Sequence, residues 1–143
     1  MTGIPRVGVV GAGSLGFHHI RILRDLPGIR FSGFVETRPE RASEVEKELG
    51  VKAQALEDLL AVSDAVIIVV PTSAHFSVAT AAIERGKHVF IEKPMALTLA
   101  DCAAMIRAAE AAGTATSFSA VGCVSARSWT ARSAVGPSPR SAT

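Results

Sequence analysis

Two patterns of apolar positions alternate along the chain. Short runs that are apolar throughout are followed by longer stretches in which an apolar residue recurs every three or four positions. Short runs of this kind are typical of buried strands, and the longer stretches are typical of amphipathic helices. The alternation predicts a parallel sheet with helices on both faces, the doubly wound class of α/β fold. We expect strands at 6–10, 30–35, 51–55, 65–70 and 88–91, and helices at 14–26, 39–49, 57–60, 74–85 and 98–112.

Several local signals refine these expectations. The run at 65–70 is apolar throughout, which favours a central strand buried on both faces. Gly50 and Gly113 stand where helices end, and Thr98 with Asp101 resembles a capping box. A further strand is expected within 114–121. The first helix is expected to direct four apolar side chains toward the sheet: Leu15, Ile20, Leu23 and Leu26.

The character of the chain changes after Gly113. The last thirty residues are rich in Ser, Ala and Thr, contain three Arg and lack acidic residues. We therefore expect one α/β domain over 1–121 and an irregular, disordered tail over 122–143, with no second domain. Two interpretations of this tail stay open, an out-of-frame reading of a GC-rich gene and a natural disordered extension.

Charge and cysteine content exclude several classes of function. The net charge of +2 comes from the tail, and no basic stripe interleaved with aromatic residues precedes it, so nucleic-acid binding is not expected. Cys102 and Cys123 lack metal-ligand spacing, which predicts reduced thiols and no metal site. The apolar runs are too short to cross a bilayer, so we expect a soluble cytoplasmic protein without membrane partners.

The most informative motif is a glycine-rich turn between the first expected strand and helix. Its three glycines would make the turn, let the backbone approach a pyrophosphate and allow close packing of the helix on the strand. The phosphates would then lie on free N–H groups at the helix N-terminus. The alternative is a purely structural glycine turn. The six residues of the motif are Gly11, Ala12, Gly13, Ser14, Leu15 and Gly16.

An acidic residue completes the dinucleotide-binding pattern. Glu36 ends the second expected strand, twenty positions beyond Gly16. A carboxylate at this point accepts hydrogen bonds from the adenosine ribose hydroxyls and repels a 2′-phosphate, which favours NAD over NADP. Thr37 and Arg38 follow it. Arg38 could stack on adenine or bind a 2′-phosphate, but with Glu36 beside it we expect a solvated charge.

Four separated motifs resemble one family, the Gfo/Idh/MocA oxidoreductases. They are GAGSLGFHH at 11–19, VET at 35–37, VPTSAH at 70–75 and EKP at 92–94. The likeness covers residues 6 to about 113. It implies a Rossmann domain that binds NAD, less favourably NADP, and a hydride transfer between nicotinamide and a sugar, nucleotide-sugar or polyol carbon.

The resemblance also implies roles for the EKP residues. Lys93 would lie beside the nicotinamide and the reacting hydroxyl, where an ammonium polarises the oxygen and helps its proton leave. Glu92 and Pro94 would fix the backbone around it, with a cis peptide bond before Pro94. The plainer alternative for Lys93 is an ordinary surface lysine.

Two further segments match the family. Val70, Pro71, Thr72 and His75 would pack along the nicotinamide ribose and the diphosphate, although Thr72 and His75 could instead cap the following helix. His19 matches the histidine three residues past the last glycine, and a packing role and a cofactor contact both stay open there. His18 and His88 match no motif, and we expect structural roles for them.

The family's acid/base pair, an aspartate and a histidine in a second domain, has no counterpart in this chain. We therefore expect the cofactor-binding half of an oxidoreductase, inactive on its own. A non-catalytic NAD-binding regulator is the alternative, and a non-functional fragment is a third interpretation.

Overall fold

The computed structural model describes residues 3–118, and its elements alternate between strands and helices as the sequence pattern predicts. Strands β1, β2 and β4 have the expected bounds. In chain order the elements are β1 (Arg6–Val10), α1 (Ser14–Asp25), β2 (Arg30–Val35), α2 (Pro39–Leu49), α3 (Leu56–Val62), β3 (Ala65–Ile68), α4 (Thr72–Glu84), β4 (His88–Ile91), α5 (Leu99–Ala112) and β5 (Thr116–Phe118).

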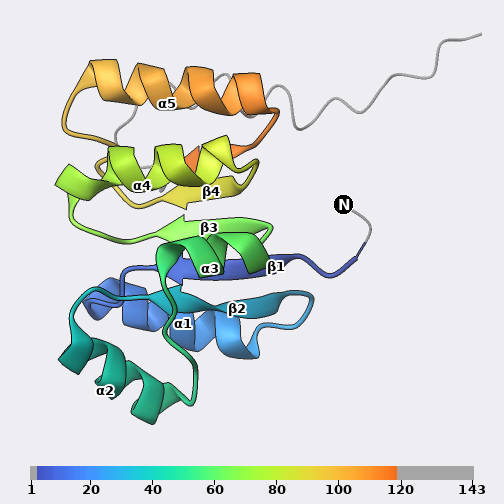
Figure 1. Ribbon diagram of the computed structural model, residues 1–143, viewed down its shortest axis with the longest axis vertical. Coiled ribbons are helices and arrows are strands. Elements are labelled where there is room, and N and C mark those ends of the chain that lie inside the picture. The colour runs from blue at the N-terminus through green and yellow to red at the C-terminus, as the bar shows by residue number, and fades with distance from the viewer. Residues whose placement is uncertain (1–2, 119–143) are drawn as a thin grey trace, which may run out of the picture.

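The five strands form one parallel sheet in the order β2-β1-β3-β4-β5 (Figure 1). One core lies between α1, α2 and one face of the sheet, and a larger core lies between the other face and α3, α4 and α5. The chain order reverses between β1 and β3, and in open α/β sheets ligands bind at such a reversal, beyond the carboxyl ends of the strands. The predicted doubly wound Rossmann fold is therefore confirmed.

The helix ends follow the expected chemistry. Gly50 and Gly113 adopt left-handed conformations with φ of 64° and 68°, which a residue without Cβ adopts at little cost. At the start of α5, the Thr98 hydroxyl accepts a hydrogen bond from the Asp101 amide at 3.1 Å. No helix among residues 3–118 is long and apolar enough to cross a membrane.

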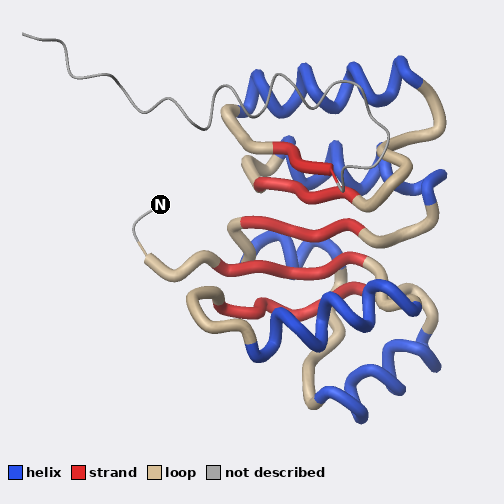
Figure 2. The backbone as a smooth tube through the Cα atoms, turned by 180° about the vertical axis from the view of Figure 1, so that it is seen from behind, coloured by secondary structure: helices blue, strands red, loops and turns tan. Residues whose placement is uncertain are grey.

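The sheet face that carries α1 is only partly covered, which corrects one expectation. On β3, Val66 and Ile68 are buried whereas Ala65 and Ile67 are partly exposed, and β4 alternates in the same way. Figure 2 shows the reason: α1 crosses the β1–β2 side of this face, and none of the described helices covers β3 and β4 there. The expectation that β3 is buried on both faces is wrong.

Two smaller expectations also differ from the structure, and a third agrees with it. The strand expected at 51–55 is reduced to a single bridge between Phe34 and Ala53. Leu15 and Leu26, expected to face the sheet, are 48% and 44% exposed, because α1 turns only its Ile20 side into the core. The strand expected within 114–121 exists as β5. The predictions for 122–143, including Cys123, concern residues outside the described part of the chain.

Candidate dinucleotide-binding site

The glycine-rich turn joins β1 to α1 by a path that two of its glycines make possible. Gly11 has φ of 100°, and a Cβ there would collide with the Val69 carbonyl oxygen. A Cβ on Gly16 would collide with the Gly11 carbonyl oxygen, so α1 could not pack so closely on the turn. These two positions therefore require glycine for the shape of the turn itself.

Gly13 differs from its neighbours because a Cβ there would meet open space. It is the N-cap of α1, has φ of −65° and offers no side-chain cap to the helix. The first amides of a helix lack partners within it, and the dipole favours an anion beside them. The open space over Gly13 and the uncapped end of α1, which starts with Ser14 and Leu15, fit the diphosphate of a dinucleotide.

Glu36 lies against this turn from the end of β2. Its Oε2 accepts a hydrogen bond from the Ala12 amide at 3.0 Å, and its side chain is only 6% exposed. Burial raises the pKa of Glu36, but hydrogen bonds from the Arg38 guanidinium and from the Arg38 and Ala12 amides outweigh burial and bring the pKa to about 2. The carboxylate is therefore ionised at any physiological pH.

Arg38 holds the same carboxylate from the solvent side. Its amide and its Nε donate to Glu36 Oε1, both at 3.1 Å, and its Nη2 donates to Oε2 at 3.2 Å. The Arg38 side chain is 63% exposed and Thr37 is exposed beside it. Arg38 is thus exposed to solvent, as expected of a solvated charge, and in addition it forms an ion pair with Glu36.

Arg41 is a further neighbour of the turn, and no motif predicts it. Its Nε donates to the Ala12 carbonyl at 2.8 Å, and its guanidinium lies over the Phe17 ring at 5.5 Å from the centroid. Arg41 belongs to α2, so only the packing of α2 against α1 brings it to the turn. No motif in the sequence marks it.

The loop after β3 is tied to the loop after β4 by His75. This side chain is 1% exposed, and its Nε2 lies 2.8 Å from the Val70 carbonyl oxygen while its Nδ1 lies 2.8 Å from the Pro94 carbonyl oxygen. The ring therefore lies inside the protein. Pro71, the N-cap of α4, and Thr72, its first residue, stand at the surface of the same loop.

The EKP residues follow β4 at the same edge. The Glu92 amide donates to the Ile68 carbonyl at 3.1 Å, and Glu92 Oε1 lies 3.1 Å from Nε2 of His19 on α1. The Lys93–Pro94 peptide bond is cis, as the resemblance implies, and the Lys93 side chain is exposed. Glu92 thus faces α1, whereas Lys93 and Pro94 are exposed to solvent.

All three loops lie at one edge of the sheet, because they follow the carboxyl ends of the parallel neighbours β1, β3 and β4 (Figure 1). The glycine turn, the Val70–Thr72 segment and the EKP segment are thus brought together. Among the described residues, no cluster of three His, Cys, Asp or Glu side chains could hold a metal ion.

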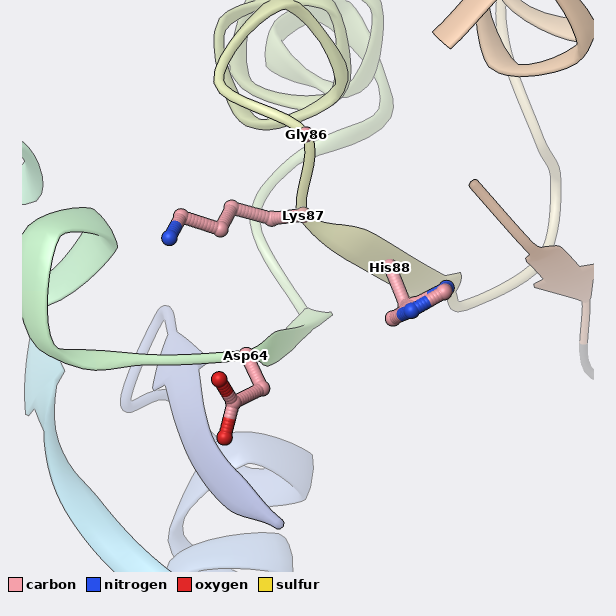
Figure 3. A pocket seen from close by; sticks show the side chains of 4 residues that line it. All are labelled: Asp64, Gly86, Lys87 and His88. Carbon is pink, nitrogen blue, oxygen red and sulfur yellow. The ribbon is translucent and has the colours of Figure 1, made fainter. Parts of the chain in front are cut away.

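A hollow of about 280 Å³ opens at the opposite edge of the sheet (Figure 3). It is lined by Asp64, Gly86, Lys87 and His88, which precede or begin β3 and β4. Asp64 is held there by Arg6, whose Nη2 lies 3.0 Å from its Oδ1. In Figure 3 the Lys87 and His88 side chains point to opposite sides, so the hollow offers no convergent set of polar groups.

Comparisons with known proteins agree with this geometry. Residues 5–119 match the Gfo/Idh/MocA family model, described as an oxidoreductase family with an NAD-binding Rossmann fold. The chain is 41% identical over 106 residues to UDP-N-acetylglucosamine 3-dehydrogenase of Acidithiobacillus ferrooxidans, a match that covers 73% of this chain and 33% of that protein. It is 38% identical over 101 residues to the NAD(+)-dependent scyllo-inositol 2-dehydrogenase of Bacillus subtilis, covering 66% and 29%.

Solved structures give the same result. The WlbA dehydrogenase of Bordetella pertussis, in complex with NADH and UDP-GlcNAcA, superposes with a TM-score of 0.72 at 30% identity, covering 81% of this chain and 36% of that one. The chain spans about a third of the length of the curated relatives that it matches.

Proposed function

The chain belongs to the Gfo/Idh/MocA oxidoreductases as their NAD-binding Rossmann domain, and from this we propose that it serves a hydride transfer between NAD and a hydroxyl-bearing carbon of a sugar, nucleotide sugar or polyol. The observation that carries the proposal is the hydrogen bond between the Ala12 amide and Glu36. The hydrogen bond holds the carboxylate to which we assign the ribose hydroxyls against the uncapped turn to which we assign the phosphates.

Different residues of the site bind different parts of the cofactor. The backbone of Gly11–Gly16 and the N-terminus of α1 receive the diphosphate, with Gly13 leaving the room for it. Glu36 accepts hydrogen bonds from the adenosine ribose hydroxyls, and its negative charge repels a 2′-phosphate, so the site prefers NAD to NADP. The Val70–Thr72 backbone lines the nicotinamide half, and the buried His75 holds that loop in place.

Lys93 is the catalytic candidate. Bound NAD⁺ supplies the hydride acceptor. The exposed Lys93 ammonium, at the edge where β4 ends, hydrogen-bonds to the reacting hydroxyl and stabilises the negative charge that develops as its proton leaves. Glu92 and Pro94 fix the backbone on either side, Glu92 through its contact with His19.

The substrate class rests on the relatives. Those named above act on a nucleotide sugar and on an inositol, and the chain spans about a third of each. We assign the substrate pocket and the acid/base pair to a second domain of a longer protein. The regulator alternative has no support from these relatives, which are dehydrogenases.

A chimera tests the proposal. Residues 3–118 would replace the matched segment of the A. ferrooxidans UDP-N-acetylglucosamine 3-dehydrogenase, and reduction of NAD⁺ would be followed with that enzyme's own substrate. We expect turnover, and we expect Lys93→Ala to lower kcat by about 10²–10⁴-fold while NADH affinity is retained. Lys47→Ala, on the exposed surface of α2, is the control. Unchanged kcat in the Lys93→Ala chimera would contradict the proposal.

A further inference from the structure

The Glu36 carboxylate is saturated with hydrogen-bond donors. A carboxylate offers about four lone-pair positions, two on each oxygen. Here Oε2 accepts from the Ala12 amide and from Nη2 of Arg38, and Oε1 accepts from the amide and from Nε of Arg38. With this side chain only 6% exposed, a ribose cannot bind Glu36 while all four donors stay in place.

The four donors fall into two pairs. Two are backbone amides, those of Ala12 and Arg38, and they reach one carboxylate oxygen each. The other two belong to the Arg38 guanidinium, and they also reach one oxygen each. If the guanidinium leaves, each oxygen keeps its amide and gains one free position. Two free positions on neighbouring oxygens match the two adjacent hydroxyl donors of a ribose.

We propose that Arg38 is a specificity-determining residue whose guanidinium competes with the adenosine ribose for Glu36 and is displaced when NAD binds. The inference rests on the proposed function, because it takes Glu36 as the ribose-binding residue. It gives Arg38 a role opposite to that of a cofactor contact: the side chain occupies the ribose site until the cofactor arrives.

The surroundings of Arg38 allow this movement. The side chain is 63% exposed, and Glu36 is its hydrogen-bond partner within the described part of the chain. The guanidinium is largely in water, and two ribose hydroxyls would replace its two hydrogen bonds to Glu36, so its release should cost about two- to fivefold in NAD affinity. Arg41, by contrast, is held by the Ala12 carbonyl and the Phe17 ring, so it does not take over the position.

The same guanidinium has the opposite effect on NADP. A 2′-phosphate brings about two negative charges and leaves only the 3′-hydroxyl as a donor for Glu36, and a nearby carboxylate repels the phosphate. A guanidinium that stays between the two anions hydrogen-bonds to both and reduces this repulsion. Arg38 therefore weakens NAD binding and strengthens NADP binding. It thereby reduces the preference for NAD over NADP that the Glu36 carboxylate creates.

The test is calorimetric titration of the full chain with NAD⁺ and with NADP⁺. We expect Arg38→Ala to tighten NAD⁺ binding about two- to fivefold and to weaken NADP⁺ binding by at least about threefold. Arg38→Lys keeps the charge without the planar guanidinium, and its affinities for both cofactors should fall between those of the unaltered chain and those of Arg38→Ala. Arg30→Ala removes an exposed arginine at the opposite end of β2 and should leave the ratio of the two affinities unchanged.

Each outcome has one meaning. Weaker NAD⁺ binding by a folded Arg38→Ala chain would show that the guanidinium contacts the cofactor, and would overturn the inference while the proposed function stands. Unchanged affinity for both cofactors would overturn it as well. Failure of the unaltered chain to bind NAD⁺ would overturn the proposed function and this inference together. A circular-dichroism melt of each variant establishes that it is folded.

Discussion

His19 and Glu92 lie 3.1 Å apart, Nε2 to Oε1, although 73 positions separate them in the sequence. The contact joins α1, which starts at the glycine turn, to the segment that carries Lys93. Both side chains are partly buried, and the His19 ring also meets Phe90 of β4 edge to face. The two parts of the site are thereby held as one unit.

This pair should contribute measurably to folding. His19→Phe keeps an aromatic ring beside Phe90 but removes the hydrogen bond, so we expect it to lower the free energy of unfolding by about 1 kcal/mol. A double-mutant cycle with Glu92→Gln, measured by urea denaturation, should give a coupling of about 0.5–1 kcal/mol. His18→Phe, on the exposed side of the same helix, is the control. A coupling of zero would mean that the pair does not hold the loop.

The open space over Gly13 allows binding to be separated from folding. Gly13→Asp puts an acceptor at the N-cap of α1, so the fold should be unchanged or more stable by a few tenths of a kcal/mol. The same carboxylate occupies the diphosphate position and repels it, so NADH binding, followed by its fluorescence, should be lost.

The matched control for that variant is Ala55→Asp, which adds the same charge at the N-cap of α3, where no cofactor is expected. It should leave NADH binding unaltered. Full NADH affinity in Gly13→Asp would refute the placement of the diphosphate.

Glu36 should make part of the stability dependent on acid pH. Its pKa is about 2 in the folded protein against an ordinary 4.5, so the ionised carboxylate stabilises the fold. This contribution, about 3 kcal/mol from the size of the shift, is present above pH 4.5 and is lost as the pH falls toward 2. Asp64, whose pKa the hydrogen bonds from Arg6 also lower to about 2, responds in the same range.

A comparison of variants isolates the Glu36 contribution. Glu36→Gln should be less stable than the unaltered chain at pH 7 and equally stable near pH 2, as measured by urea denaturation at each pH. Glu48→Gln changes an exposed position on α2, and its free energy of unfolding should vary with pH in the same way as that of the unaltered chain. Parallel curves for Glu36→Gln would contradict the assigned pKa.

The fold was largely predictable because its strands are short apolar runs that end at Gly, Pro or polar residues. The three errors share a cause. The sequence pattern shows that Leu15 is apolar and that the run at 65–70 is apolar throughout. It does not show which other elements of the fold lie over these positions and bury them. For the segment 51–55, tertiary packing left only the bridge between Ala53 and Phe34.

The site was predictable as far as it depends on local chain geometry. The glycine turn and Glu36 follow from spacing, because a strand, a turn and a helix of fixed dimensions place them together. The ring of His75 between two carbonyls, Arg41 on the Ala12 carbonyl and the guanidinium of Arg38 on Glu36 depend on side chains meeting across elements. Residue types at a given spacing do not specify such contacts.

Calorimetric titration of the unaltered chain with NAD⁺ and NADP⁺ is the decisive test of the assigned cofactor site. We expect saturable binding of one NAD⁺ per chain, tighter than the binding of NADP⁺. Heats that never saturate with NAD⁺, from a chain shown to be folded, would contradict the assignment of the glycine turn and Glu36 as a cofactor site.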